Sequence, residues 1–284
     1  MSGASSPAAV YDEAYYAGPM AEWHRRSLPT FAAFLDRATA GRPPGRVLDL
    51  GCGDGAYGAV LRPRASRLVG CDAAAAALGR AAERGIYDEL LAADLETARR
   101  EDLDPAGAGY DLVWSTEVVE HLADPDRLFR LAAELLAPGG RLVLTTTGYH
   151  FYVFYYLALV RPLSRRDLAD WLAGWVSGRR ADRFVETLWQ VTGGHRTGFS
   201  RRRLARLARR AGLVVRELRP ANVQPVAPVE HLRAAPGAGA AARLGWRLLA
   251  AAGRLANALC RRTGLYGPNL LLAAERPAGE AAPR

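Results

Sequence analysis

Alternating glycines beside a carboxylate are the residues of this sequence best suited to binding a charged ligand. Gly51, Gly53 and Gly55 come directly after the apolar run Val47–Leu50. Glycine adopts positive φ and has no Cβ, so the backbone here can approach a ligand closely. Asp49 lies on the apolar run, two residues before the first glycine. The pattern predicts a strand, a glycine turn and a helix N-terminus that together bind a nucleotide.

Two classes of nucleotide fit this glycine turn. The segment Gly53–Gly58 reads G-x-G-x-x-G, a pattern that binds dinucleotides such as NAD. Asp49 disfavours NAD, because a carboxylate at this point repels a pyrophosphate at the helix N-terminus. The same carboxylate suits a ligand that carries a cationic amino-acid group. A tight turn without any ligand is a third interpretation, although three alternating glycines cost backbone entropy.

Two further carboxylates follow the next apolar segments. Asp72 comes after Leu68–Cys71, and Asp94 comes after Leu90–Ala93. An acid at the end of the second strand is the expected partner of ribose hydroxyls, and Asp94 would lie within reach of an adenine amino group. A single aspartate at such a place more often caps a turn or a helix. Three of them on successive strands favour a ligand site.

The elements that must position these residues alternate along the chain. The predicted strands are Arg46–Leu50, Arg67–Cys71, Glu89–Ala93, Tyr110–Ser115, Arg141–Thr146, Leu213–Leu218 and Asn269–Ala274. The predicted helices between and after them are Ala56–Leu61, Ala74–Arg84, Pro125–Leu136 and Ser200–Ala211. This alternation predicts an α/β fold with a doubly wound, mostly parallel seven-stranded sheet that binds ligands at the carboxyl ends of its strands.

Five segments divide the chain. We expect an N-terminal helical segment that covers the ligand as a lid or simply packs on the core, a ligand-binding core, an aromatic and arginine-rich insertion that forms an acceptor lobe, a late region with the last strands and an amphipathic helix, and a disordered tail. In that order they are residues 1–44, 45–148, 149–198, 199–276 (with the helix at 239–262) and 277–284. Helical insertions are therefore expected after the fifth strand and between the sixth and seventh.

The glycine turn resembles motif I of the class I S-adenosylmethionine-dependent methyltransferases, (D/E)-x-G-x-G-x-G, with Asp49 and the three glycines in register. Residues Tyr110–Leu122 and Leu136–Leu144 resemble the "YDLV…EVLEH…LKPGG.L" block of the ubiquinone-biosynthesis-like small-molecule methyltransferases. The resemblance runs from about Val47 to Thr147. It implies a Rossmann-like fold and S-adenosyl-L-methionine as cofactor.

The resemblance also implies roles for the residues in register. Asp49, Gly51 and Gly53 would surround the methionine portion of the cofactor, Asp72 would hold the ribose, and Asp94 would hold the adenine. The full set of cofactor-binding residues expected on this basis is Asp49, Gly51, Cys52, Gly53, Asp72, Ala73, Asp94, Leu95, Ser115 and Glu117.

Two histidines are candidate catalytic bases, because methyl transfer to a hydroxyl acceptor requires removal of a proton. His121 lies just past the fourth predicted strand, and a structural role for it is equally compatible with the sequence. His195 lies in a loop before the late helix, in a segment that resembles the "H.r.fs" stretch of many of these enzymes.

Glu117, Glu120 and His121 are spaced so that they could share one face of a helix. Such a face could hold a divalent ion, and some relatives of the ubiquinone type are thought to use a metal near this position. A hydrogen-bonded or solvated face is the preferred interpretation. No metal is expected.

The cysteine content and the apolar runs indicate the cellular compartment of the protein. The 284 residues include three cysteines without a C-x-x-C pair, so neither a disulfide framework nor a zinc site is indicated, and a cytoplasmic protein is expected. The N-terminus does not resemble a signal peptide. The longest apolar run, Phe151–Val160, has ten residues and is too short to span a bilayer as a helix.

The basic residues are unevenly distributed. Residues 161–219 hold 15 Arg against 5 acidic residues, and such a region could contact nucleic acid. Base-amine methylases of this fold carry an Asn/Asp-Pro-Pro-aromatic signature after the fourth strand, where this sequence reads Ser115-Thr116-Glu117-Val118. A nucleic-acid partner is therefore not expected. An RNA-modifying methyltransferase and a non-catalytic cofactor-binding module remain the alternatives.

Residues 239–262 predict one amphipathic helix, with arginines and leucines on separate arcs. This helix could pack on the sheet or on a second subunit, or it could rest on an anionic membrane surface. On a membrane, the acceptor would be a lipid or a lipid-linked molecule. The sequence thus predicts methylation, most often at oxygen, of a small-molecule or lipid-linked acceptor.

Overall fold

The computed structural model describes residues 19–40, 44–148, 195–221 and 269–279, together with four single helical positions at 247, 251, 255 and 258. The predicted acceptor lobe, the first part of the lid segment, the end of the tail and most of the amphipathic helix lie outside the described residues. The predicted segment boundaries stay predictions.

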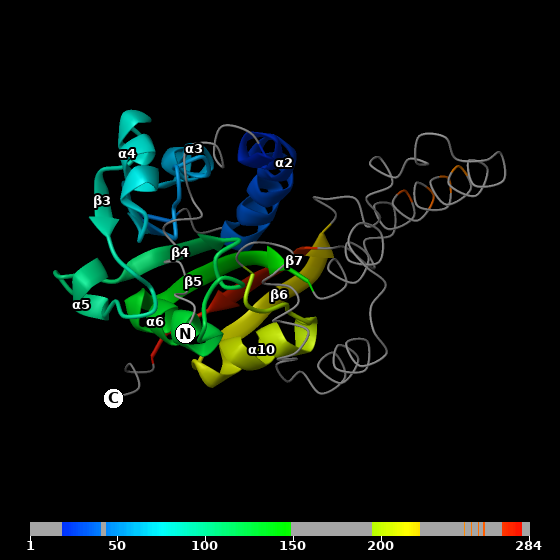
Figure 1. Ribbon diagram of the computed structural model, residues 1–284. Coiled ribbons are helices and arrows are strands. Elements are labelled where there is room, and N and C mark those ends of the chain that lie inside the picture. Colours follow the sequence, from blue (N-terminus) through cyan, green and yellow to red (C-terminus); the bar gives the residue numbers. More distant parts are fainter. Residues whose placement is uncertain are drawn as a thin grey trace, which may run out of the picture.

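Seven strands form one sheet in the order β3-β2-β1-β4-β5-β7-β6 (Figure 1). The strands are β1 (Arg46–Leu50), β2 (Arg67–Asp72), β3 (Glu89–Ala92), β4 (Tyr110–Thr116), β5 (Leu136–Thr147), β6 (Val214–Ala221) and β7 (Asn269–Glu275). Only β7 runs against its neighbours, because it pairs antiparallel with both β5 and β6. The predicted doubly wound, mostly parallel sheet is confirmed.

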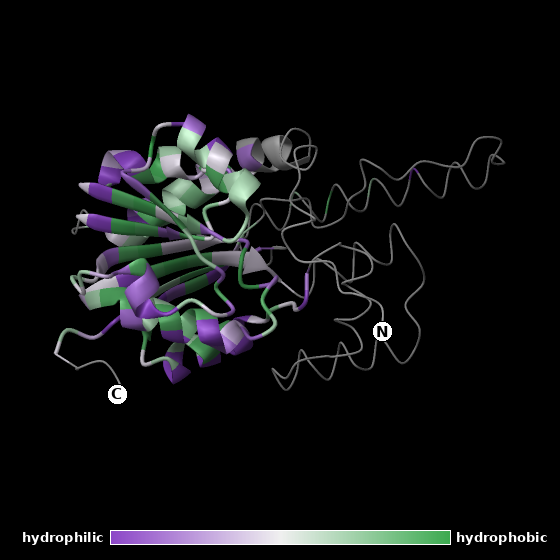
Figure 2. Ribbon diagram, turned by 60° about the vertical axis from the view of Figure 1, so that its left-hand side comes forward, coloured by the Kyte–Doolittle hydropathy of each residue, from purple (hydrophilic) through white to green (hydrophobic). Residues whose placement is uncertain are grey.

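Helices cover both faces of the sheet (Figure 1). The layer above the sheet in this view contains α2 (Pro19–Thr39), α3 (Gly58–Leu61) and α4 (Ala75–Glu83), and the layer below it contains α5 (Arg100–Leu103), α6 (Pro125–Leu135) and α10 (Arg201–Arg210). A short 3₁₀ turn, η2 (Arg62–Arg64), follows α3. Figure 2 shows the apolar strands between the two helical layers.

The alternation of side chains along each strand builds two cores. On β1, Val47 packs in the core that contains Phe31 and Phe34 of α2, whereas Leu48 and Leu50 belong to the core that α6 and α10 cover. Successive strand residues point to opposite faces, so an unbroken apolar run fits a sheet that is buried on both sides. The position of Asp49 in such a run requires a partner for its buried carboxylate.

β5 and α5 differ most from the prediction, and β6 also ends three residues later than expected, at Ala221. β5 begins at Leu136 and not at Arg141, because the Pro-Gly-Gly stretch ends α6 and then continues in extended pairing, with Gly139 at φ +78° and its N–H on the carbonyl of Arg276. The helix α5 was not predicted. It is four residues long, and one helical turn is too short to give a periodic signal.

The carboxyl ends of β1, β2, β3 and β4 lie at one edge of the sheet, because these strands are parallel. β2 and β4 lie on opposite sides of β1, so the strand order reverses there. In open α/β sheets, ligands bind at the carboxyl edge where the order reverses. The predicted glycine turn and strand-end acids belong to this edge.

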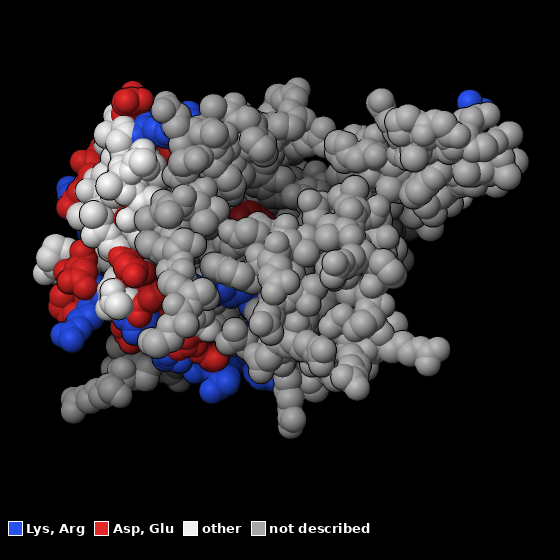
Figure 3. Space-filling model, in the orientation of Figure 1, with Lys and Arg blue, Asp and Glu red and all other residues white. Residues whose placement is uncertain are grey.

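The described surface carries both signs of charge. Figure 3 shows acidic and basic side chains close together along the left-hand edge, where α4 and α5 lie. Among the described arginines of the basic region, Arg216 of β6 is exposed and so are five on α10: Arg201, Arg202, Arg206, Arg209 and Arg210. Most of that region lies outside the described residues, so the expectation that it does not contact nucleic acid stays a prediction.

The four described positions in 239–262 are helical and exposed, and Leu255 is 72% exposed. The amphipathic helix and its membrane contact stay predictions. Within the described ranges, no helix combines the length and the apolar character needed to cross a membrane.

Candidate active site

The glycine turn has the backbone that its sequence predicts. Gly51, Gly53 and Gly55 have φ values of +81°, +54° and +77°, a region that L-residues with a Cβ rarely adopt. The N–H groups of Gly51 and Cys52 both donate to the carbonyl of Cys71, at 2.9 Å each. These two hydrogen bonds therefore hold the glycine turn against the end of β2. The Cys52 side chain is buried, and burial raises the pKa of its thiol.

Asp72 joins the end of β2 to the glycine turn. Its Oδ2 accepts the N–H of Gly53, and its Oδ1 accepts the N–H of Ala74, both at 2.9 Å. Burial raises the pKa of this carboxyl, while the backbone hydrogen bonds oppose the shift. Each carboxylate oxygen accepts more than one hydrogen bond, so both oxygens keep the capacity to bind hydroxyl groups. The neighbouring Ala73 is exposed.

Asp49 lies beneath the glycine turn and is only 2% exposed. Its Oδ2 accepts the phenol O–H of Tyr87 at 2.7 Å. Burial raises the pKa of Asp49 to about 7, the hydrogen bond from Tyr87 lowers it, and the nearby Asp72 and Asp54 raise it. A buried carboxyl that titrates near neutrality is a common property of functional sites.

The remaining predicted cofactor residues differ in what they offer. Asp94 is exposed, and its Oδ1 accepts the N–H of Glu96, so it closes a turn as the alternative interpretation predicts. Leu95 is buried in the core. The buried hydroxyl of Ser115 donates to the carbonyl of Leu50 at 3.0 Å and ties β4 to β1. The side chains of Leu95 and Ser115 are thus committed to the protein interior, so only their backbone N–H and C=O groups could bind a ligand.

The turn after β4 contacts the glycine turn. A Cβ placed on Gly51 would lie 2.5 Å from Cγ2 of Val118, and the carbonyl of Val118 accepts the N–H of His121. The segment that carries His121 is thus packed directly against the predicted cofactor site.

We expect Gly51→Ala to destabilise the protein by about 2–5 kcal/mol. The left-handed backbone costs about 1–2 kcal/mol for a residue with a Cβ, and the overlap with Val118 costs about 1–3 kcal/mol more. Urea unfolding measures the loss. Gly212→Ala is the matched control, because Gly212 has φ +77° and a Cβ placed on it would meet nothing within 4 Å. An equal loss in the two variants would contradict the contact with Val118.

An acid pair occupies the same turn. Glu117 has φ +52°, an uncommon backbone for a residue other than glycine, and its carboxylate accepts the hydroxyls of Thr145 (3.0 Å) and Thr147 (2.9 Å). Glu120 is fully buried and accepts the hydroxyl of Thr146 at 2.8 Å. A hydrogen bond joins the two carboxyl groups, and burial beside Glu117 raises the pKa of Glu120 well above its usual range.

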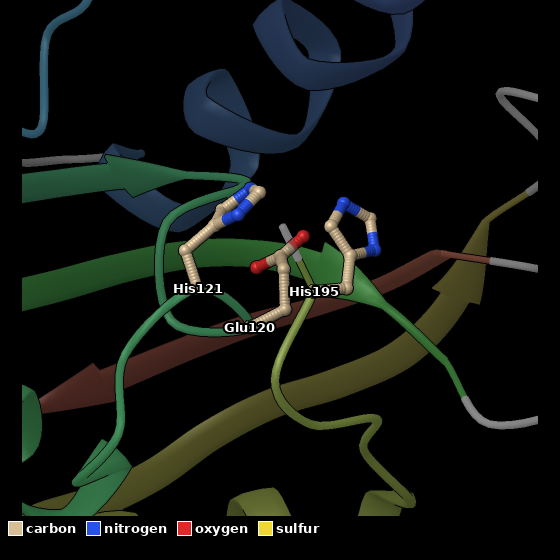
Figure 4. A group of neighbouring side chains, drawn as sticks. All are labelled: Glu120, His121 and His195. Carbon is tan, nitrogen blue, oxygen red and sulfur yellow. The ribbon is translucent and has the colours of Figure 1, made fainter. Parts of the chain in front are cut away.

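The structure brings the two predicted histidines together (Figure 4). The rings of His121 and His195 lie edge to face, with centroids 4.6 Å apart and the Glu120 carboxyl group between their side chains. His121 follows β4, and His195 comes from the segment before α10. Burial and the neighbouring His121 lower the pKa of His195 well below its usual value, so this imidazole is neutral at physiological pH.

Backbone hydrogen bonds hold the His195 segment in place. The N–H groups of Arg196 and Thr197 donate to the carbonyl of Glu120, at 2.7 and 3.2 Å. The buried Arg203 of α10 donates to the hydroxyl of Thr197 and lies over the ring of Phe199. The imidazole of His195 is therefore held beside His121, which belongs to the turn that packs against Gly51.

A ligand atom of each of Glu120, His121 and His195 lies within 4.8 Å of the other two. One carboxylate and two imidazoles form a donor set that transition-metal ions accept. Here, however, the Glu120 carboxyl is raised in pKa, is bonded to Thr146 and shares a hydrogen bond with Glu117. Metal ligands must be deprotonated, and the expectation that no metal binds at this cluster stays a prediction.

Some residues of this site have no motif of their own. Tyr87 belongs to no sequence motif, yet its hydroxyl donates to the Asp49 carboxylate. Gly58 and Gly70 do not have positive φ, so their backbone does not require glycine. A glycine at such a position can indicate that a large side chain packs against it, and at these two positions that side chain is Tyr87. The three threonines that bind the acid pair follow one another in β5, and such a run of hydroxyls in an apolar strand marks buried polar partners.

Comparisons with known proteins identify the family of this chain. A family model described as "Methyltransferase domain" matches residues 21–218. The ubiquinone biosynthesis O-methyltransferase of Cereibacter sphaeroides is 34% identical over 131 residues, which are 46% of this chain and 49% of that protein. The enzyme of the same name from a Caulobacter species is 37% identical over 118 residues, or 40% and 46% of the two chains. The chain thus spans about half the length of these curated relatives.

A solved S-adenosylmethionine-dependent methyltransferase from Mesorhizobium loti has the same fold. It superposes with a TM-score of 0.54 at 22% identity, over 88% of this chain and 98% of the other. The resemblance stated from the sequence is confirmed. Because the family model covers more than two thirds of the 284 residues, the chain belongs to the methyltransferase-domain family.

Proposed function

We propose that the protein is an S-adenosyl-L-methionine-dependent O-methyltransferase that acts on a small-molecule or lipid-linked hydroxyl acceptor. One observation carries the proposal. The glycine turn with Asp49 and Asp72 is in contact, through Gly51 and Val118, with the turn that carries His121. The glycine turn would bind a nucleoside that carries an amino-acid group. The histidine pair, which would accept a proton, lies next to it at the same edge of the sheet.

The described residues fit the cofactor. When bound, S-adenosyl-L-methionine supplies an electrophilic methyl group on a sulfonium. The glycine turn leaves room for a backbone approach, Asp49 would pair with the ammonium group, and Asp72 would accept the ribose hydroxyls. Asp94, at the end of β3, would contact the adenine.

The histidine pair would act on the acceptor. A neutral His195 would take the proton of the acceptor hydroxyl as the acceptor oxygen bonds to the methyl carbon and the sulfur–methyl bond of the cofactor breaks, which would leave S-adenosylhomocysteine. Alignment of the two reactants and a positioned base are the two contributions that this reaction needs from a protein. The proton passes from the acceptor oxygen to an imidazole nitrogen.

The acceptor class is supported by the relatives. Those from Cereibacter sphaeroides and Caulobacter are O-methyltransferases of ubiquinone biosynthesis, which suggests an aromatic hydroxyl on an apolar molecule. The predicted acceptor lobe, the cytoplasmic setting and a peripheral membrane contact through residues 239–262 remain parts of the proposal.

Calorimetry followed by a transfer assay tests the function. We expect S-adenosylhomocysteine to bind and NAD not to bind, and methyl transfer from labelled cofactor to phenols and polyprenyl phenols but not to RNA. Transfer to RNA alone would support the RNA-modifying alternative, and cofactor binding without any transfer would support a non-catalytic module. Binding of NAD alone would overturn the proposal.

Cofactor affinity is expected to fall at acid pH. Asp49 has a pKa of about 7 in the protein without ligand, so below that pH it holds a proton that an ammonium ligand must displace. The affinity for S-adenosylhomocysteine should rise as the pH rises toward 7 and then level off, with a limiting change of about tenfold per pH unit below 7. Calorimetry between pH 5 and 8 measures the curve. Asp49→Asn should bind more weakly with a flat profile, and an unchanged slope in this variant would assign the titration elsewhere.

A further inference from the structure

Tyr87 is the side chain that connects Asp49 to the rest of the site. It lies in the segment between α4 and β3 and is partly buried. Its phenol donates to Oδ2 of Asp49 at 2.7 Å. Among the described residues, no other side chain donates to this carboxylate, so Oδ1 is left for a ligand.

The ring of Tyr87 occupies space that three glycines leave open. A Cβ on Gly55, Gly58 or Gly70 would lie 2.9, 2.7 or 2.9 Å from an atom of the tyrosine side chain. Gly58 begins a helix and Gly70 lies in β2, and neither has positive φ. These two positions therefore need glycine to admit the ring, whereas the backbone there would accept other residues. Tyr87 therefore contacts the glycine turn at Gly55, β1 at Asp49 and β2 at Gly70.

The segment around Tyr87 is anchored at both sides. Arg84 donates to Oδ2 of Asp54 in the glycine turn at 2.7 Å. Asp88 accepts the N–H of Leu68 through Oδ2 at 2.6 Å and donates its own N–H to the Leu68 carbonyl at 2.9 Å. The phenol is consequently fixed in position beneath the turn before any ligand arrives.

We propose that Tyr87 is a positioning residue that orients Asp49 for the ammonium group of the cofactor. The proposal rests on the function proposed above. A carboxylate that is nearly fully buried needs a donor to remain ionised, and the phenol is that donor. Burial raises the pKa of Asp49, the hydrogen bond from Tyr87 lowers it, and the nearby Asp72 and Asp54 raise it further. With Oδ2 bonded to Tyr87, Oδ1 is the oxygen that would pair with the ammonium group.

A purely structural role makes a different prediction. If Tyr87 only filled the space beneath the glycines, loss of its hydroxyl would affect every ligand of the turn alike. If it acts through Asp49, the loss affects only ligands that have an amino-acid group. S-adenosylhomocysteine and 5′-methylthioadenosine share the thioether nucleoside, and only the first has the amino-acid group.

Calorimetry with both ligands on the full chain tests the proposal. Tyr87→Phe keeps the ring and removes the hydroxyl. We expect it to bind S-adenosylhomocysteine about tenfold more weakly, as for a lost hydrogen bond to a charged group, and to bind 5′-methylthioadenosine within about twofold of the parent chain. Tyr110→Phe is the matched control, because it removes another buried phenol hydrogen bond, to the carbonyl of Leu103, and should change neither affinity. Thermal unfolding of both variants checks that they are folded.

A double-mutant cycle with Asp49→Asn completes the test. Because Tyr87 acts through Asp49, Tyr87→Phe should have little further effect on S-adenosylhomocysteine affinity in the Asp49→Asn background. An equal loss for both ligands, no loss for either, or full additivity with Asp49→Asn would overturn the proposal. If the parent chain binds neither 5′-methylthioadenosine nor S-adenosylhomocysteine, the proposed function itself fails, which is a distinguishable result.

Discussion

Replacing His195 by glutamine is expected to lower kcat by about two to four powers of ten, the usual contribution of a positioned general base. The half-buried imidazole of His195 has a lowered pKa and lies edge to face with His121. It is neutral at physiological pH and can take a proton, which glutamine cannot do in this range. Because neither His195 nor His121 belongs to the glycine turn, the affinity for S-adenosylhomocysteine should stay within about twofold.

Single-turnover transfer and calorimetry on the same preparation separate the two effects. Comparison with His121→Gln shows which of the two imidazoles contributes more to kcat. Arg203→Lys tests whether the hydrogen bond from Arg203 to Thr197, in the His195 segment, affects the rate. Each assay is repeated after dialysis against a chelator. A chelator-induced loss that a divalent cation restores would reassign the cluster of Glu120 and the two histidines to metal binding. A kcat of His195→Gln within about threefold of the parent chain would remove His195 from proton transfer.

Asp72→Ala is expected to weaken cofactor binding by about a hundredfold. The substitution removes the acceptor proposed for two ribose hydroxyls, and hydrogen bonds to a charged group contribute about 1.5–3 kcal/mol each. It also releases the N–H groups of Gly53 and Ala74, which the carboxylate holds at 2.9 Å. Part of the loss therefore comes from a looser glycine turn, since a turn that is not preorganised binds more weakly.

Asp111→Ala is the matched control for Asp72→Ala. Asp111 also accepts two backbone N–H groups, those of Gly45 and Arg46, at 3.0 and 2.7 Å. These contacts lie at the start of β1, at the opposite edge of the sheet from the glycine turn. Asp111→Ala should lower stability and leave cofactor affinity unchanged. An unchanged affinity in Asp72→Ala would mean that the ribose is bound elsewhere.

The fold and the glycine turn follow from local patterns in the sequence. Apolar runs of strand length, the glycines at 51, 53 and 55 and the acids after successive strands are short-range signals, and the structure reproduces β1 at its predicted bounds. Parallel strands linked by helices must bring their carboxyl ends to one edge. Asp49, Asp72 and the turn were therefore predictable together, although the ligand that they bind stays a proposal.

The fold class, the glycine turn and the edge at which the acids gather can thus be derived from the amino-acid sequence alone. The distant side chains that meet at this edge are known only from the packed molecule. It pairs His195 with His121, gives Asp49 the phenol of Tyr87, and commits the hydroxyl of Ser115 to the Leu50 carbonyl. The difference lies in the range of the interactions. A strand or a turn is specified by neighbours along the chain, whereas a buried hydrogen bond between separate segments depends on how the helices and loops pack against the sheet, and no periodicity in the sequence encodes that packing.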